Sequence, residues 1–190
     1  NHHDPSPKDE LAETAKIKTK LPNEEEYSAS DPYTTAINSV RGKAFQAFLG
    51  FVFNDSKLLD PKGKQLSEDV KSLYQRTIEK EPTQAIMFLF GHSLPFFFFR
   101  DTPWLKGKLG IIFNQEPNRE NLRIATWEGY LANNLYKEIF FDPYFQKLYS
   151  EAIKKDPLAY PKRRYFLDPS EGLANHIALA LVHYDEFNFD

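Results

Sequence analysis

Histidines are the first side chains to consider for metal binding or proton transfer, since the sequence holds five His and no Cys. His176 and His183 stand seven positions apart and could share a helix face. Metal ligands on a helix usually stand three or four residues apart, so this spacing indicates an ordinary partly buried and partly exposed pair. His92 is typical of a turn between helices. No Gly-x-Ser-x-Gly elbow is present, and the sequence predicts no catalytic residue, metal site or cofactor.

A second candidate is a basic and aromatic cluster formed by Lys162, Arg163, Arg164 and Tyr165. Together with two lysines just upstream, this stretch carries five positive charges within eleven residues. Such a stretch can hold phosphate groups and stack on nucleic-acid bases. The whole chain is nevertheless slightly acidic, with a formal net charge of −3, and nearby prolines indicate a loop between helices. We interpret the loop 160–166 first as a patch that faces a protein partner, with nucleic-acid or phosphate binding as the alternative.

Arg41 is the third candidate, because it interrupts a mostly apolar helical stretch next to Gly42. A planar guanidinium pairs well with carboxylates and loop carbonyls. We expect an intramolecular contact of this kind and keep ligand contact as the alternative. Gly42 and Gly129 both lie inside helical windows, where glycine costs about 1 kcal/mol relative to alanine. Close approach of another helix is the simplest reason for them, and a kink is the competing one.

The elements that position these residues are predicted to be helices. A residue that can cap a helix precedes proline at Asp31-Pro32, Glu81-Pro82, Thr102-Pro103, Asp142-Pro143, Asp156-Pro157 and Asp168-Pro169. Proline is tolerated at the first helical position, and the preceding side chain can accept from the first-turn amides. Ser67 and Asn118 are two further predicted caps. Apolar residues between these starts follow steps of three and four, which indicates roughly seven helices of 10–20 residues in an all-α fold. The aromatic run from Phe96 to Phe99 suits a tightly buried helix or a strand.

Two segments of the chain match each other at an offset of 87 residues. Ile37 corresponds to Ile124 and Gly42 to Gly129, and further matches continue to Asp142. This offset is about twice the length of a HEAT or armadillo unit. The fold predicted is therefore a stack of antiparallel helix pairs resembling an α-solenoid, or else a compact helical bundle without true repeats.

The stretch 36–44 resembles a helix that recurs in the helical-repeat regions of large bacterial proteins, some of which carry a STAND-type ATPase or act in antiphage defence. The helix starts at Asp101-Thr102-Pro103-Trp104 and around Trp127-Glu128-Gly129 are similar in style. The resemblance implies a sensor or scaffold region whose ATPase and effector lie elsewhere. This chain contains no match to the ATPase motifs, so nucleotide binding is not implied.

The domain organisation expected is a flexible linker over residues 1–29, with a short helix around Asp9 to Lys18, followed by a helical-repeat domain over 30–190. We expect the chain to be a fragment of a longer protein. The longest apolar run, Ile86 to Phe99, is too short and too interrupted to span a membrane, and the absence of Cys suits a reducing cytoplasm.

The function predicted from the sequence is a non-catalytic scaffold or sensor that binds a protein partner, or other domains of its own chain, in the bacterial cytoplasm. Two alternatives stay open. One is a nucleic-acid or phosphate-binding array centred on 160–166. The other is a small helical enzyme, which would need His92 or His176 beside a carboxylate in a closed pocket.

Overall fold

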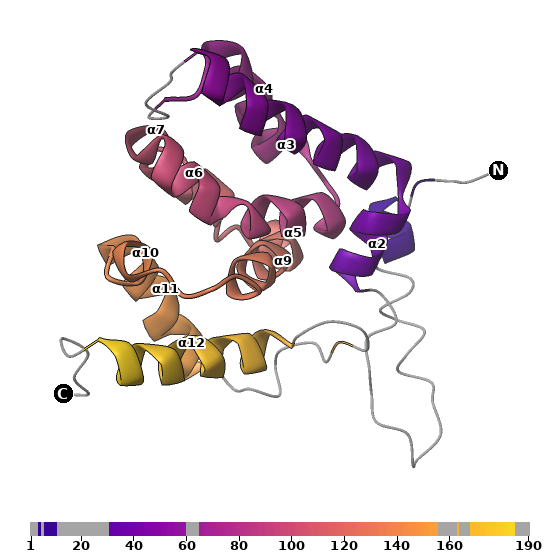
Figure 1. The fold of residues 1–190 in the computed structure, drawn as a ribbon. Coiled ribbons are helices and arrows are strands. Elements are labelled where there is room, and N and C mark those ends of the chain that lie inside the picture. Colours follow the sequence, from indigo (N-terminus) through magenta and orange to yellow (C-terminus); the bar gives the residue numbers. More distant parts are fainter. Residues whose placement is uncertain are drawn as a thin grey trace.

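The structure is a computed structural model that describes residues 4, 6–10, 31–59, 65–155, 163 and 168–184, with the side chains of 55–59 excepted. Every regular element among these residues is a helix (Figure 1). After a short helical stretch at 7–10, the elements are α2 (Pro32–Asn38), α3 (Val40–Leu59), α4 (Glu68–Lys80), α5 (Gln84–His92), α6 (Leu94–Arg100), α7 (Thr102–Lys106), α8 (Leu109–Ile112), a 3-10 turn (Pro117–Arg119), α9 (Glu120–Leu131), α10 (Lys137–Phe140), α11 (Pro143–Lys154) and α12 (Pro169–His183).

The centre of the molecule is the pair formed by α5 and α9, which pack against each other more extensively than any other two described elements. Seven consecutive residues of α5 are buried, and so are seven of α9. A helix that is covered all round in this way lies inside a fold. Helices α2 and α3 also contact α5, and α12 contacts α9. Figure 1 shows α4 along one side of the molecule, α12 along the opposite side, and α5, α6 and α9 between them.

Two glycines allow α5 and α9 to approach each other. A Cβ added at Gly129 would stand 2.0 Å from the carbonyl oxygen of Phe88, and one at Gly91 would stand 1.9 Å from that of Thr126. These distances are shorter than any real contact, so only glycine fits at either position. A Cβ added at Gly42 would likewise stand 1.9 Å from the carbonyl oxygen of Ala36. The prediction that Gly42 and Gly129 allow close packing is confirmed.

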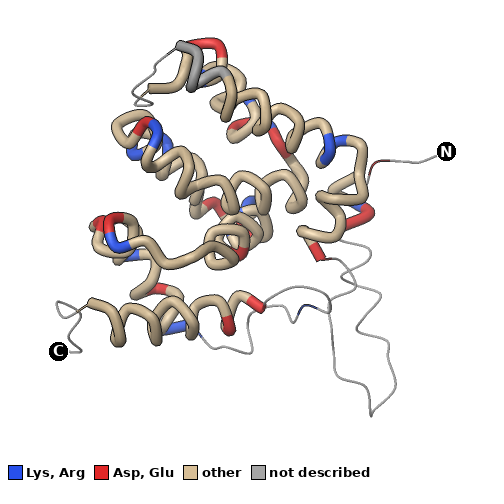
Figure 2. Tube along the Cα trace, in the orientation of Figure 1, with Lys and Arg blue, Asp and Glu red and all other residues tan. Residues whose placement is uncertain are grey.

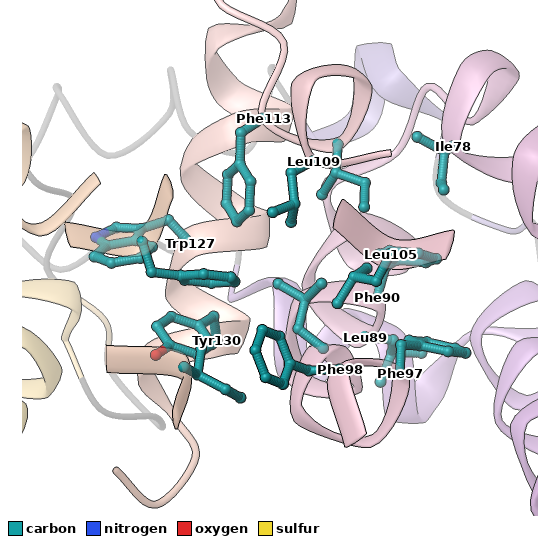
Figure 3. Close-up of a cluster of buried hydrophobic side chains, with 14 of the residues drawn as sticks. Ile78, Leu89, Phe90, Phe97, Phe98, Leu105, Leu109, Phe113, Trp127 and Tyr130 are labelled. Atoms are coloured by element: carbon teal, nitrogen blue, oxygen red, sulfur yellow. The ribbon is translucent and has the colours of Figure 1, made fainter. Parts of the chain in front are cut away.

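Aromatic rings pack together with leucine and isoleucine side chains around this pair (Figure 3). Tyr74 of α4 is fully buried, and its ring lies 4.5 Å from that of Phe97 and 5.5 Å from that of Phe90, centroid to centroid. On the other side of the core, Trp127 and Tyr130 of α9 pack with their ring centroids 5.3 Å apart. Edge-to-face and tilted contacts of this kind add to the stability that burial supplies. The core is therefore continuous from α4 to α9.

Local chemistry explains where several helices begin. The Asp31 carboxylate accepts from Tyr33 N and Thr34 N, the Asp142 carboxylate accepts from Tyr144 N, and the Ser67 hydroxyl accepts from Val70 N. Helix α12 begins at Pro169 as predicted, although no bond from the Asp168 side chain to its first turn is present. These starts agree with the sequence-based prediction, while Asp156-Pro157 lies outside the described residues.

Other predicted helix starts are displaced. The Glu81 carboxylate accepts from Thr83 N, so α5 begins only at Gln84. Asp101, and not Thr102, caps α7, because its Oδ1 accepts from Trp104 N at 3.2 Å. Asn118 lies within a 3-10 turn and caps no helix. Among the described elements only α3, α4, α9, α11 and α12 exceed ten residues, so over the described part of the chain the prediction of roughly seven helices of 10–20 residues is wrong. Short helices separated by tight turns replace the missing long ones.

The match at an offset of 87 residues does not extend to helix boundaries. The first segment is broken at Ser39, between α2 and α3, whereas the corresponding position in the second segment lies in the middle of α9. Val52 and its neighbours belong to one long helix, whereas the residues that match them fall in the turn after α9 and in the short α10. The described part of the chain is all-α as predicted, and these two segments do not form equivalent helix pairs.

Two acidic residues of the predicted linker contact the helical domain. Asp4 Oδ1 accepts from Val40 N at 2.8 Å, at the beginning of α3. The buried Glu10 carboxylate accepts from Gln84 N at 2.8 Å and from Ala85 N at 3.2 Å, at the beginning of α5. Two acidic side chains therefore cap helices far along the chain. Of the predicted linker over 1–29, residues 4 and 10 thus contact the helical domain, and residues 11–30 lie outside the described residues.

Candidate binding cleft

An open cleft of about 810 Å³ lies between α2–α3 and α5–α6. Its lining residues are Tyr33 and Ile37 of α2, Gln46, Leu49, Gly50 and Phe53 of α3, Leu89, His92 and Ser93 at the end of α5, Pro95, Phe96, Phe99 and Arg100 of α6, and Asn133 and Tyr136 after α9. A volume of this size is within the range of known ligand pockets, which are mostly apolar with a few polar groups.

Three large apolar side chains on the walls of the cleft are exposed to solvent. The exposed fractions are 37% for Ile37, 43% for Phe53 and 50% for Phe99. The rings of Phe53 and Phe96 meet edge to face at 4.1 Å between centroids, and those of Phe99 and Tyr136 meet at 5.4 Å. The rings are thus held in place by one another, and one face of the cleft is left uncovered.

The geometry of α6 explains how Phe99 reaches the cleft. Pro95 stands in the first turn of this seven-residue helix, where its missing N–H costs nothing. Phe97 and Phe98 then turn into the core, with exposed fractions of 0% and 6%, while Phe99 faces out. The sequence suited either a tightly buried helix or a strand over Phe96 to Phe99; the run forms a helix, in which Phe96 is half-buried and Phe99 is exposed.

Gly50 gives the cleft part of its depth. A Cβ added at Gly50 would meet nothing within 4 Å, so the missing side chain leaves open space in the wall that α3 contributes. Gly110 is the same in this respect but lies in α8, away from the cleft. A larger side chain at position 50 would occupy the cleft without a clash.

The polar groups of the cleft mostly serve the protein itself. The Ser93 hydroxyl donates to Leu89 O at 2.9 Å, and the Asn133 amide donates to Gly129 O at 3.1 Å. Arg100 is buried, with an exposed fraction of 9%. His92 is exposed at the end of α5, and none of the described lining residues is Asp or Glu. The cleft is therefore suited to apolar groups.

Arg41 lies outside the cleft. Its Nη1 donates to Glu81 Oε1 at 3.2 Å, with its side chain 44% exposed. This contact joins the beginning of α3 to the end of α4, and the expectation of an intramolecular carboxylate partner is confirmed.

Arg163 is buried, whereas the sequence placed it in a loop patch that faces a protein partner. Its Nε donates to Glu128 Oε1 at 2.5 Å and its Nη2 donates to Glu128 Oε2 at 2.7 Å. The two side chains are 4% and 1% exposed. Desolvation raises the pKa of the Glu128 carboxyl, while Arg163 favours its ionised form. Arg163 N also donates to Asp168 Oδ1, so this arginine ties its segment to α9. Lys162, Arg164 and Tyr165 lie outside the described residues.

The two C-terminal histidines behave as the sequence suggested, since His176 is buried and His183 is exposed. His176 Nε2 lies 2.8 Å from Asn133 O, a carbonyl that can only accept, so Nε2 carries the proton. Its Nδ1 then accepts from the Tyr149 hydroxyl at 2.6 Å, and Tyr149 lies 3.1 Å from the hydroxyl of Tyr130. This buried chain connects α12, α11 and α9. No group of three potential metal ligands is present among the described residues.

A second apolar surface runs along α11 and α12. The exposed fractions of Ile153, Leu181 and Val182 are 53%, 47% and 74%. The first two line a shallow groove of about 380 Å³.

No helix among the described residues is long and apolar enough to cross a membrane. Acidic and basic residues are interspersed along the helices in the described part of the chain (Figure 2).

The residues of the cleft were not recognised from the sequence as a site. Gly50, between Leu49 and Phe51, was the available signal, because glycine in a long helix requires a reason. Comparison with protein-family models, with curated proteins and with solved structures finds no match to this chain.

Proposed function

We propose that this chain is a non-catalytic protein-binding module and that the cleft between α2–α3 and α5–α6 receives an apolar segment of its partner. One observation carries the proposal: Ile37, Phe53 and Phe99 are all exposed and all line the same cleft. Exposed apolar side chains that stand singly need no explanation, whereas a cluster around a concavity is typical of an interaction site.

The chemistry of the cleft indicates the kind of partner. Its aromatic walls favour side chains such as Leu, Phe or Trp, inserted from a helix or an extended segment. The hydroxyl of Ser93 and the amide of Asn133 already have acceptors within the protein. Binding would therefore rest on apolar burial, and the affinity would depend little on salt.

The resemblance to helical-repeat regions supports a wider setting for this role. We propose that the chain acts as a sensing scaffold in a larger cytoplasmic bacterial protein, with a protein partner or another domain of the same protein as the bound species. Repeat-type stacking of helix pairs is the arrangement that the resemblance implies for such a protein.

Site-specific photo-crosslinking tests the proposal. A photoreactive phenylalanine analogue is placed at Phe53, inside the cleft, or at Phe51, which lies on the same helix with an exposed fraction of 59% and does not line the cleft. Each protein is irradiated in extract of the source cells, with and without nuclease treatment. We expect a protein adduct from position 53 and none from position 51, and Gly50→Leu should abolish it.

Gly110→Leu is the matched control, because it adds the same side chain to open space outside the cleft. The adduct should survive this change. Equal labelling from positions 51 and 53, or an adduct that persists in Gly50→Leu, would contradict the proposal. An interaction lost on nuclease treatment would instead favour nucleic-acid binding.

A further inference from the structure

Helix α3 presents one of its faces to the cleft. Gln46, Leu49, Gly50 and Phe53 line the cleft from this helix, and their spacing of i, i+3, i+4 and i+7 is that of a single helix face. In a helical fold such a face normally packs against another helix. Among the described elements, α3 packs most extensively against α2 and α5, and Phe53 remains 43% exposed. The face of α3 that looks into the cleft is therefore only partly covered.

Glycine marks the places where helices of this protein approach each other most closely. A Cβ added at Gly42, Gly91 or Gly129 would stand within 2.0 Å of a carbonyl oxygen on another helix. Gly50 stands within the 20-residue α3, where glycine disfavours the helix, and no described atom lies within 4 Å of the place of its Cβ. Gly110 also faces open space, but it lies in the four-residue α8. By comparison with the other three glycines, Gly50 is a position at which a further helix can approach.

The backbone in the floor of the cleft is already hydrogen-bonded. Leu89 O accepts from Ser93 N at 3.0 Å and from the Ser93 hydroxyl at 2.9 Å. Asn133 O accepts from His176 Nε2 at 2.8 Å. An extended segment carries N–H and C=O groups without internal partners, and burying such groups unpaired is unfavourable. A helix bonds its own backbone groups. The cleft therefore favours an occupant whose backbone is bonded internally.

We propose that the occupant of the cleft is an amphipathic helix of the partner, which lies along α3 with a small residue against Gly50. This inference rests on the proposed function and specifies the form of the bound segment. Large apolar side chains three or four positions before and after the small residue lie on the same helix face. They reach the rings of Phe53 and Phe99, which are 43% and 50% exposed. Burial of these rings supplies the affinity, and the contact at Gly50 sets the distance between the two helices.

Selection from two peptide libraries against the full chain tests the form of the bound segment. Both libraries hold peptides of about 15 residues, long enough to form a helix, with the same variable positions in a framework rich in Ala, Glu and Lys. The second library carries a fixed proline at its centre, which prevents a continuous helix. We expect binders from the first library only, with Gly, Ala or Ser between two large apolar residues. Circular dichroism should show that their helicity rises on binding.

Variants at position 50 test where the selected peptide lies. Gly50→Leu should abolish its binding, and Gly110→Leu, which adds the same side chain outside the cleft, should leave the affinity unchanged. Gly50→Ala is the sharper variant, because one methyl group is enough to hold two closely packed helices apart. We expect it to weaken binding by about tenfold, although alanine favours α3 itself.

Three outcomes would overturn the inference. Equal affinity of the peptide for the unaltered chain and for Gly50→Ala would show that no helix backbone approaches α3 at this position. Binders from the proline library that Gly50→Leu abolishes would show that an extended segment occupies the cleft, and the proposed function would still stand. If neither library yields a binder that Gly50→Leu abolishes, the proposed function fails together with the inference.

Discussion

Glycine serves opposite purposes at the α5–α9 contact and in the wall of the cleft. At the α5–α9 contact, Gly129 has no side chain because a backbone carbonyl stands where its Cβ would be. In the wall of the cleft, Gly50 has open space at the same place. The α5–α9 contact has no room for a side chain, while the wall of the cleft has room for one. We therefore expect substitutions of Gly129 to destabilise the fold and substitutions of Gly50 to affect binding.

The largest expected effect is that of Gly129→Ala. The added Cβ would stand 2.0 Å from Phe88 O and 2.9 Å from His92 N. Backbone atoms cannot rotate away, so α5 and α9 must separate. We expect a loss of about 3 kcal/mol or more in the free energy of unfolding, at or above the usual upper value for overpacking. Urea denaturation followed by circular dichroism measures it. A loss below about 1 kcal/mol would show that the two helices can move apart easily.

The second expected effect concerns the buried ion pair on α9. Arg163→Met leaves Glu128 buried without its charged partner, and breaking such a pair costs about 3 kcal/mol or more. Arg41→Met removes a pair whose arginine is 44% exposed, which is worth at most about 1 kcal/mol. Both variants are measured by the same denaturation experiment. Similar losses would contradict the assignment of Arg163 to the interior.

The third effect is a dependence of stability on pH. Burial lowers the pKa of His176 from its ordinary value of 6.5. The unfolded chain therefore binds a proton more readily than the folded one, so stability present above pH 6.5 is lost as the pH falls below it. The loss is about 1.4 kcal/mol per pH unit until the folded pKa is reached. His176→Gln should flatten this slope between about pH 7 and pH 5, and an unchanged slope would assign the effect to another group.

Local signals let the sequence predict much of the helical framework. Asp31 and Asp142 cap helices because an acidic residue followed by proline is sufficient for a helix start wherever it occurs. The start of α5 was misplaced for the opposite reason. Its first amides donate to Glu10, which is distant in sequence. A pattern of neighbouring residues cannot predict a partner that lies so far along the chain.

The cleft and the role of Arg163 depend on tertiary contacts in the same way. Arg163 stands among basic neighbours in the sequence, so it was interpreted as part of an exposed patch. Its partner, Glu128, lies 35 positions away on a buried helix. Phe99 looked like the end of a buried aromatic run. Its exposure follows from the direction in which α6 turns its last residues, which spacing alone does not determine.

The smallest expected effect is a gain in stability, at Gly50. Gly50→Ala adds a Cβ to open space within the 20-residue helix α3. Because alanine is a better helix former than glycine, the free energy of unfolding should rise by about 1 kcal/mol. Denaturation of Gly50→Ala and Gly129→Ala side by side measures the difference between an open and a filled site. A destabilised Gly50→Ala would mean that α3 lies closer to α6 than the cleft allows. A stabilised one would show that glycine at position 50 is retained at a cost to stability, as expected where the open space itself serves binding.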